Sequence, residues 1–455
     1  MIFISAIAKK PSDKPEGATG SFQLPPLSFG LLFLMAFMGY CLWLALRPIA
    51  SDDIWWMLKT GQLILEQKTI FHQDIFSFTA TAQEWINHEW LTCIMFYLLY
   101  SAGGFTALLI LKLSVILASY LIIFKTISTK SDVRLVPLSA AGILALFALP
   151  GHIYFDVHAF IFTYLFIALA ILILEIGQQT GSEKQLFWLV PLNILWVNMH
   201  GGFPVSIFLQ LAYLFGRGAK VWRARKKDTM KKNKAGSSPG QPLWKDVVAD
   251  LRVPLSVLGL SLLVLLLNPY GFKMLTYPFS FFHQDYYSRH ITEWLSPEFL
   301  GANWNFSLVF GIFALSILFA RKKIPLRHLI VFGGFSVPAF TAVRHIAIFS
   351  LAAIPAASVA FSRLGEVDRH VRRDSKFSKL KPWIAAMLLA LFLTLAYKGF
   401  YRLPYRSPNM LPAMFPVGAA DFLQKNKLKG NLYNAYEWGC YLIWKRQSIH
   451  ITFLP

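Results

Sequence analysis

Long apolar segments separated by short polar connections make up most of the chain. About eleven of them are long enough, or nearly so, to cross the ~30 Å hydrocarbon core of a bilayer. They lie near residues 27–46, 104–124, 135–150, 158–176, 186–200, 203–216, 254–268, 305–320, 326–342, 344–361 and 382–399. Several fall short of the ~20 residues that an upright helix needs, so the pattern allows about ten to twelve spans. The sequence therefore predicts an all-α polytopic membrane protein.

Two regions depart from this pattern. In residues 47–90, between the first two spans, an amphipathic run from Ser51 to about Gln67 predicts a helix that lies along the membrane surface. Residues 400–455 follow the last span, and their pattern predicts a strand, a helix and a strand over 430–436, 438–446 and 449–453. A unit of this size is too small to bury a core of its own. We therefore expect an α/β tail that is either an incomplete domain or packs on the membrane domain of residues 27–399.

The distribution of charge predicts the orientation. Only 15% of the residues are charged, and the net charge is +21. A basic excess in a soluble protein would suggest a nucleic-acid partner, but here apolar segments separate the charges. With a cytoplasmic N-terminus, the inner loops together with Arg327 hold 29 of the 44 Lys and Arg residues, and the outer loops before residue 400 hold six. The positive-inside rule then predicts that the leader 1–26 and the loop 217–253 are cytoplasmic and that residues 400–455 are outside.

The loop 217–253 is the most basic of the inner loops. It carries eleven Lys and Arg residues and contains the linker-like run Lys234–Gly240. We expect a flexible segment close to anionic lipid headgroups. The alternative is that its charge serves only to fix the topology.

The same topology gathers most histidines on the outer face. The run from His152 to His158 has the residue types of a metal site, but three ligands from one short turn rarely have good geometry, so a turn with interfacial polar residues is favoured. His200 lies in Asn198-Met199-His200-Gly201-Gly202, whose glycines allow a helix or a ligand to approach closely. Helix packing is favoured for the glycines, and both a structural and a functional role stay open for His200.

Several motifs of known chemistry are missing from the sequence. It has no GxxxxGK(S/T), no GxGxxG after a strand, no HExxH and no GxSxG, so nucleotide-binding, zinc-peptidase and α/β-hydrolase functions lack support. The cysteines Cys41, Cys93 and Cys440 have neither metal-ligand spacing nor a disulfide pattern.

The first outer loop contains the strongest candidates for chemistry. Asp52 and Asp53 open its amphipathic run, and Asp74 and Glu89 follow. An acid held against an apolar interface can have a raised pKa and act as a general base. The alternative is that Asp52 and Asp53 cap the helix, with the tryptophan pair 55–56 at the level of the lipid headgroups.

A set of motifs extends this pattern over residues 27–447. They are Asp53-Ile54-Trp55-Trp56, Asp74-Ile75-Phe76-Ser77, Asn87-His88-Glu89-Trp90-Leu91, Asn198-Met199-His200-Gly201-Gly202, Leu267-Asn268-Pro269-Tyr270-Gly271, Glu293-Trp294, Val343-Arg344-His345 and Tyr436-Glu437-Trp438-Gly439. A membrane helix followed by an acidic motif that opens a long outer loop resembles the GT-C superfamily of glycosyltransferases. Within this superfamily the chain looks like the bacterial relatives of protein mannosyltransferases and lipid A sugar transferases, and it resembles a further, poorly characterised bacterial group more closely still. It departs from their pattern at Met57, where a histidine would be expected, and that group usually continues into a soluble outer domain.

The resemblance implies an enzyme of the bacterial cytoplasmic membrane. It would move a sugar from a polyprenyl phosphate to a glycan, lipid or protein acceptor on the outer face, with a divalent metal as an optional cofactor and no nucleic-acid partner. Asp53 would take the acceptor proton, and the further catalytic candidates are Asp52, Asp74 and Glu89. The candidates for holding the phosphate are Arg344, His345, His200, His88 and Arg289.

Arg344 and the loop 270–304 each have a structural alternative to a functional role. Arg344 lies between two apolar runs, where an arginine needs an anionic partner. Phosphate suits its planar fork, but an acid such as Glu293 or Asp53 would serve as well. The loop 270–304 would be either a lid over a lipid-linked substrate or an ordinary interfacial loop.

Two other functions compete with glycosyl transfer. One is a transporter or flippase of a lipid-linked sugar, and the other is a non-catalytic assembly protein with the same fold. Transporters commonly show internal repeats and ionisable groups near the middle of the bilayer. Here we find no repeat, and the spans contain few charged residues away from the outer-face motifs, among them Lys112 and Glu175.

Overall fold

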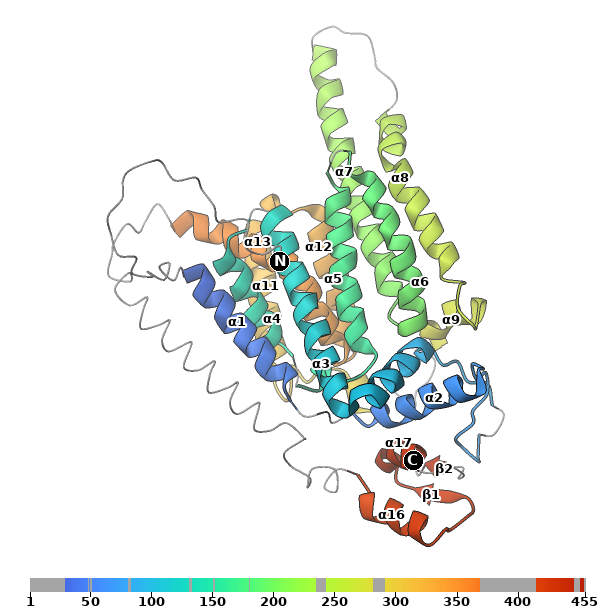
Figure 1. The fold of residues 1–455 in the computed structure, drawn as a ribbon. Coiled ribbons are helices and arrows are strands. Elements are labelled where there is room, and N and C mark those ends of the chain that lie inside the picture. The colour runs from blue at the N-terminus through green and yellow to red at the C-terminus, as the bar shows by residue number, and fades with distance from the viewer. Residues whose placement is uncertain are drawn as a thin grey trace, which may run out of the picture.

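The computed structural model describes a helical bundle with a small α/β unit at one end (Figure 1). The described residues are 29–47, 49, 51–80, 83–130, 133–149, 152–179, 181–234, 243–280, 291–368, 415–445 and 451–453. The predicted leader 1–26 and the predicted span 382–399 lie outside them.

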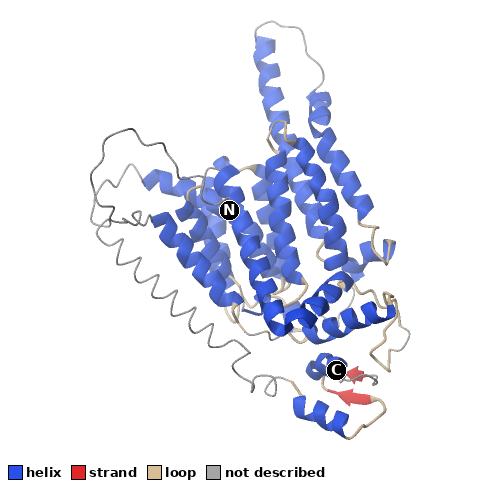
Figure 2. Cartoon of the chain, viewed as in Figure 1, coloured by secondary structure: helices blue, strands red, loops and turns tan. Residues whose placement is uncertain are grey.

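Helices make up most of the described chain. The α-helices are α1 (Phe29–Ala45), α2 (Asp53–Gln67), α3 (Trp90–Lys130), α4 (Leu135–Phe147), α5 (Phe160–Gly177), α6 (Leu189–Met199), α7 (Pro204–Lys234), α8 (Leu243–Val264), α9 (Phe272–Ser280), α11 (Trp304–Ala320), α12 (Leu326–Thr341), α13 (His345–Asp368), α16 (Val417–Lys425) and α17 (Tyr436–Lys445). Short 3-10 helices are η1 (His152–Phe155), η2 (Glu183–Trp188), η4 (Thr292–Trp294) and η5 (Arg321–Lys323). Figure 2 shows the two strands, β1 (Leu432–Asn434) and β2 (Ile451–Phe453), in the tail.

Apolar helices indicate a multi-pass membrane protein. Among the described residues, five helices are long and apolar enough to cross a membrane, within Trp90–Thr129, Phe160–Gly177, Trp244–Val264, Trp304–Lys323 and His345–Leu364. Shorter apolar helices accompany them at Gly30–Ala45 and Leu135–Phe147. Small residues let α13 pack closely inside the bundle, since almost no surface is exposed at Ala352, Ala353, Ala356, Ala357 and Ala360.

The connections between these helices meet at two opposite ends of the bundle (Figure 1). At one end, the side-chain amide of Asn305, in α11, donates hydrogen bonds to the carbonyl oxygens of Phe147 (2.7 Å) and Leu149 (3.0 Å), where α4 finishes. This end also carries α2 and the tail, and we call it the α2 end. At the other end, Arg217 of α7 pairs with Asp250 of α8 at 2.6 Å.

The amphipathic helix predicted after Ser51 is confirmed as α2, which lies across the α2 end (Figure 1). It packs on the first part of α3. A Cβ atom at Gly61 would lie 2.1 Å from the carbonyl oxygen of Cys93, so only glycine allows this approach. α3 then kinks at Gly103 and Gly104, and Gly104 takes a positive φ of 58°. The kink coincides with the predicted start of the second span, and the part of α3 before it belongs to the surface layer.

The basic loop 217–253 differs from the expectation of a flexible segment. α7 and α8 continue through most of it and project beyond the rest of the bundle as an antiparallel pair (Figure 1). A second ion pair, between Arg225 and Asp246 at 3.6 Å, joins the two helices. The prediction was wrong because Lys, Arg and Ala are good helix formers. The linker-like run that prompted it overlaps residues 235–242, which lie outside the described part of the chain.

The tail is a small β-α-β unit that packs on the membrane domain. β1 and β2 pair in parallel, as the predicted strand, helix and strand require. The indole ring of Trp55 in α2 makes edge-on contacts with Tyr441 (5.0 Å between ring centres) and Phe415 (5.4 Å) of the tail. Trp55 is therefore buried beneath the tail, and the predicted headgroup position is wrong for this tryptophan.

Candidate functional site

Two side chains hold the carboxylate of Asp53 at the start of α2. Its Oδ1 accepts a 2.8 Å hydrogen bond from the indole of Trp56, and its Oδ2 lies 2.9 Å from Nε2 of His158, in the turn before α5. Burial alone would raise the pKa of Asp53, but the hydrogen bond and charge of His158 outweigh it and lower this pKa. Burial likewise opposes protonation of His158, yet the negative charge of Glu89 and the contact with Asp53 raise its pKa to about 9. The Phe160 N–H is 3.4 Å from the other ring nitrogen, too far to oppose protonation strongly. Asp53 and His158 therefore form an ion pair at neutral pH.

Asp52 has a different environment one residue earlier. It occupies the N-cap position of α2 but makes no side-chain cap hydrogen bond, so the interpretation of the two acids as helix caps is wrong. Burial raises the pKa of Asp52 to about 6, and the negative charges of Asp53, Glu437 and Asp156 act in the same direction. Glu437 belongs to α17, so the tail contributes to the electrostatics of this site. A pKa near neutral is the property that suits a general base.

Glu89, directly before α3, is buried between two histidines. Its Oε1 lies 3.3 Å from Nε2 of His88 and 3.6 Å from Nε2 of His200. Burial would raise the pKa of Glu89, but the charges of His88 and His158 lower it to about 2. The side chain of Asn87 accepts a 3.1 Å hydrogen bond from the Glu89 N–H and fixes the loop. Glu89 is therefore an ionised, positioned carboxylate.

His200 is held neutral by a chain of hydrogen bonds. The indole of Trp196 donates to Oγ1 of Thr163 (3.2 Å), whose hydroxyl donates to Nδ1 of His200 (2.8 Å), and the Gly202 N–H donates to the same nitrogen (3.1 Å). These bonds assign the ring proton to Nε2, on the side of Glu89. Burial lowers the pKa of His200 to about 3 although Glu89 acts against it. A Cβ atom at Gly202 would lie 2.6 Å from Oγ1 of Thr163, so the packing role predicted for this glycine is confirmed.

Arg344, between α12 and α13, pairs with an acid of the chain. Its Nη1 lies 3.1 Å from Oε1 of Glu293, and its guanidinium carbon lies 4.3 Å from the ring centre of Trp294. Glu293 is one of the two acids that the sequence offered as alternatives to phosphate. Nδ1 of the neighbouring His345 donates a 3.1 Å hydrogen bond to the carbonyl oxygen of Pro338, which anchors the ring to α12.

These groups interact with one another at the α2 end. The charge of Glu293 acts on His158, the partner of Asp53, and the charge of Arg344 acts on His200, the neighbour of Glu89. We call this set the α2-end cluster, and it consists of Asp52, Asp53, His88, Glu89, His158, His200, Glu293 and Arg344. It brings together residues from the first outer loop and from four later connections between helices.

Among the predicted site residues that the structure describes, Asp74 and His345 do not join the cluster, and the His345 ring is held on α12 instead. Oδ1 of Asp74 accepts hydrogen bonds from the backbone N–H groups of Phe76 (2.7 Å) and Ser77 (3.1 Å), so this carboxylate shapes a turn. Arg289 lies in 281–290, outside the described residues. The same gap removes the middle of the predicted lid 270–304 from description.

His158 and Thr163 are the members of the site that sequence reasoning missed. His158 was assigned to a polar turn, and the described part of that turn is the 3-10 helix η1 followed by bends. The available signal was its position directly before an apolar run, with Thr163 one helical turn later inside that run. A polar residue at either position faces lipid or a polar partner, and a buried hydroxyl such as that of Thr163 needs a hydrogen-bond partner.

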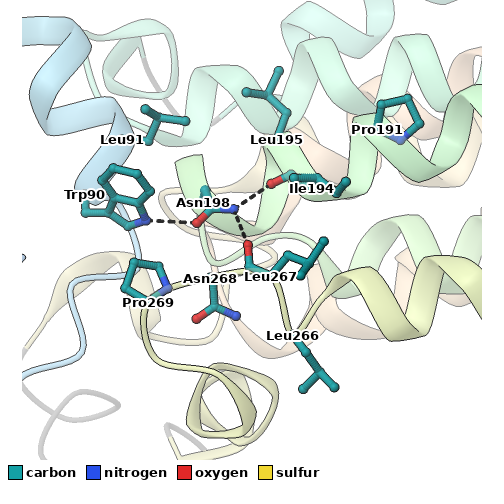
Figure 3. A pocket seen from close by; sticks show the side chains of 10 residues that line it. All are labelled: Trp90, Leu91, Pro191, Ile194, Leu195, Asn198, Leu266, Leu267, Asn268 and Pro269. Atoms are coloured by element: carbon teal, nitrogen blue, oxygen red, sulfur yellow. Dashed lines mark hydrogen bonds between the residues drawn. The ribbon is translucent and has the colours of Figure 1, made fainter.

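An open apolar groove of about 780 Å³ adjoins the cluster. Figure 3 shows its walls: Trp90 and Leu91 at the start of α3, the α6 residues 191–198, and residues 266–269 after α8. The side chain of Asn198 accepts from the Trp90 indole (3.0 Å) and donates to the carbonyl oxygens of Ile194 (2.8 Å) and Leu267 (2.9 Å). These polar groups thus hold the walls together, and the groove offers mainly hydrocarbon and ring surface to a ligand.

Among the described residues, no group of three or more His, Cys, Asp or Glu side chains is arranged to hold a metal ion. Comparisons with protein-family models and with curated protein sequences find no match to this chain. The chemistry that this chain can perform is therefore inferred from the geometry of the α2-end cluster and the groove beside it.

Proposed function

We propose that the chain is a membrane glycosyltransferase of the GT-C type, which moves a sugar from a polyprenyl phosphate to an acceptor outside the bacterial cytoplasmic membrane. In this proposal it has eleven spans, a cytoplasmic N-terminus and an α2 end that faces outward. One observation carries the proposal: two carboxylates with pKa values shifted in opposite directions and an arginine lie at one end of an apolar helical bundle, beside an open hydrocarbon groove.

The proposed mechanism assigns a role to each part of the site. The donor's hydrocarbon chain lies in the groove, and its phosphate pairs with Arg344. As the acceptor hydroxyl attacks the sugar, the bond between the sugar and the phosphate oxygen breaks and its electron pair stays on the phosphate. Asp52 takes the hydroxyl proton, and Asp53, fixed by Trp56 and His158, orients the acceptor. Proton removal and neutralisation of the leaving phosphate are the two catalytic contributions.

The base in this scheme differs from the one first expected. The sequence favoured Asp53, but its lowered pKa makes it a weak base, whereas the pKa of Asp52 lies at about 6. A base whose pKa is near the working pH combines the ionised form with useful proton affinity.

Consumption of a lipid-linked sugar by membranes that contain the full chain tests this proposal. The rate should fall as the pH drops through about 6, because Asp52 then becomes protonated. Asp52→Asn should lower the rate by about 10²–10⁴-fold, the usual contribution of a general base, and should remove this acidic limb. Glu66→Gln, on the exposed end of α2, is the matched control and should change neither. Unchanged turnover of Asp52→Asn at a normal protein level would exclude Asp52 as the base, and transbilayer movement of the lipid without a glycosidic product would favour a transporter.

A further inference from the structure

The ion pair of Arg344 is weaker in its geometry than two other arginine pairs of the bundle. Arg327 makes two contacts, at 2.8 and 2.9 Å, with the buried carboxylate of Glu175. Arg217 likewise makes two contacts, at 2.6 and 3.1 Å, with Asp250. Arg344 pairs with Glu293 through one nitrogen at 3.1 Å, and the Glu293 side chain is 40% exposed. The carboxylate of Glu293 can therefore leave Arg344 and enter water at small cost.

The backbone around this pair is fixed independently of the carboxylate. The Arg344 N–H donates to the carbonyl oxygen of Glu293 (3.0 Å), and the Val343 N–H donates to that of Leu295 (3.0 Å). The ring of Trp294 supports the guanidinium from one face at 4.3 Å. Rotation of the Glu293 side chain would thus leave Arg344 in place, with its fork turned to a new partner.

The negative charge around Arg344 favours an anionic ligand that replaces the Glu293 carboxylate over one that binds in addition to it. Six described carboxylates lie in the α2-end cluster or act on it, namely Asp52, Asp53, Glu89, Asp156, Glu293 and Glu437. The positive charges among them are His88, His158, Arg344 and the buried Lys112, which lies 3.9 Å from Asp156. An anionic ligand added to this excess of negative charge would be repelled. An anion that replaces a carboxylate at Arg344 adds little charge.

We propose that Glu293 occupies an anion site at Arg344 and is displaced by the phosphate of a lipid-linked ligand. Its carboxylate is a placeholder that keeps the guanidinium paired until the ligand arrives, and it lowers the apparent affinity for that ligand by competition. The inference rests on the proposed function only in naming a polyprenyl phosphate as the ligand. The exchange itself depends on the geometry of Arg344 and Glu293.

Equilibrium binding of radiolabelled farnesyl monophosphate to the purified full chain in lipid nanodiscs tests the exchange. Glu293→Gln should lower the Kd about two- to fivefold, the range expected when a half-exposed ion pair no longer competes. Arg344→Gln should raise the Kd at least tenfold, as loss of a charge-assisted contact requires. Glu298→Gln, a few residues away on the same connection, is the matched control and should leave the Kd unchanged. Glu293→Asp keeps the charge on a shorter side chain and should give an intermediate Kd.

The outcomes separate this inference from the proposed function. If Glu293→Gln keeps the melting temperature of the unaltered protein but binds the probe equally or more weakly, the placeholder role is refuted. If Glu293→Gln unfolds, Glu293→Asp takes its place, and the placeholder role is refuted when this variant binds the probe no more tightly than the unaltered protein. Absence of probe binding in every variant also overturns the anion site. Tighter binding by Glu293→Gln without any sugar transfer by the unaltered chain would reject the glycosyltransferase and leave the anion site standing.

Discussion

Side chains of the same chemical type in the α2-end cluster have widely separated pKa values. Glu89 has a pKa of about 2 and Asp52 one of about 6, while His158 has a pKa of about 9 and His200 one of about 3. Neighbours cause the separation. The cation of His158 is stabilised by two carboxylates, and the neutral ring of His200 is fixed by the donors to its Nδ1. Titratable groups whose environments separate their pKa values are typical of sites for acid–base chemistry.

The pair of Asp53 and His158 predicts a pH window of stability. The pKa of Asp53 is lowered, so its contribution is present above its unfolded value of about 4 and is lost as the pH falls through the folded value. The pKa of His158 is raised to about 9, so its contribution is full below about 6.5 and is lost as the pH rises through about 9. His158→Gln should therefore lower the stability by about 1 kcal/mol at neutral pH, because the Asp53 side chain is partly exposed, and by little above pH 10.

Melting temperatures of the detergent-purified protein between pH 4 and pH 10 measure this effect. Lys273→Gln removes the exposed ion pair between Lys273 and Glu84 and serves as the control with little loss at any pH. A deficit of His158→Gln that is the same at pH 7 and pH 10 would show that the histidine acts by packing alone.

Sequence analysis could propose the members of the cluster but not their partners. Asp53, Glu89 and Arg344 were candidates because each is a charged residue at the edge of an apolar run. His158 and Asp53 are separated by 105 positions, and only the tertiary fold, which places the turn before α5 at the start of α2, brings them together. Asp74 was a candidate for the same reason as Asp53, as an acidic residue in a motif of the first outer loop, but its carboxylate stabilises a local turn. Residue type and span edges therefore predict the region of a site, while tertiary contacts decide its members.

At the scale of elements, the predictions depended on the strength of local patterns. Apolar runs located α1, α4, α5, α11, α12 and the start of α13 to within a few residues, because apolar periodicity and length dominate helix choice in a membrane. The β-α-β tail also followed its pattern of alternation. The helices of the basic loop 217–253 were missed, since charge and a Gly-Ser-Pro run suggested a linker where helix propensity and interhelical ion pairs extend α7 and α8.

The docking of the tail predicts a specific role for Trp55. Its ring is 4% exposed and meets Tyr441 and Phe415 edge-on, so Trp55→Ala should remove about 3–5 kcal/mol from the docked state. The tail should then open locally while the bundle stays folded. Hydrogen exchange of residues 415–445 should accelerate, with no change in α5 or α13. Trp438→Ala, at a tryptophan of α17 that is 45% exposed, is the matched control. Equal protection in Trp55→Ala and the control would mean that other contacts hold the tail.

The groove between α6 and α8 makes a prediction at the same scale. If it holds the hydrocarbon chain of the donor, Leu195→Trp should fill it and raise the KM for a lipid-linked sugar about tenfold without lowering kcat. Leu195 lines the groove and is 42% exposed. Leu263→Trp adds the same ring to an exposed position of α8 outside the groove and is the control. Similar KM values for the two variants would assign the groove to bulk lipid.

At the scale of the whole molecule, the two ends of the bundle differ in chemistry. The α2 end carries histidines, acids and the tail, and the opposite end carries the projecting basic pair α7 and α8 (Figure 1). Ion pairs such as Arg217 with Asp250 satisfy part of the charge at the basic end. Arg223 and Lys226, among others, remain exposed on α7. An excess of Lys and Arg on short connections is typical of the cytoplasmic side.

This polarity predicts the topology of the chain. The tail and the α7–α8 pair lie at opposite ends of the bundle, so a reporter at Pro455 and one near Ser237 should always give opposite results (Figure 1). A reporter active only outside the cytoplasm should work at Pro455 and fail at Ser237, because 29 of the 44 Lys and Arg residues fall on the predicted inner side. The tail itself is basic, but long extramembrane segments cross the membrane with little regard to charge. Activity at both positions would contradict the arrangement of the helices. The reverse result with stable protein would leave the fold intact and turn the α2-end cluster towards the cytoplasm, where a donor on the outer leaflet could not reach it.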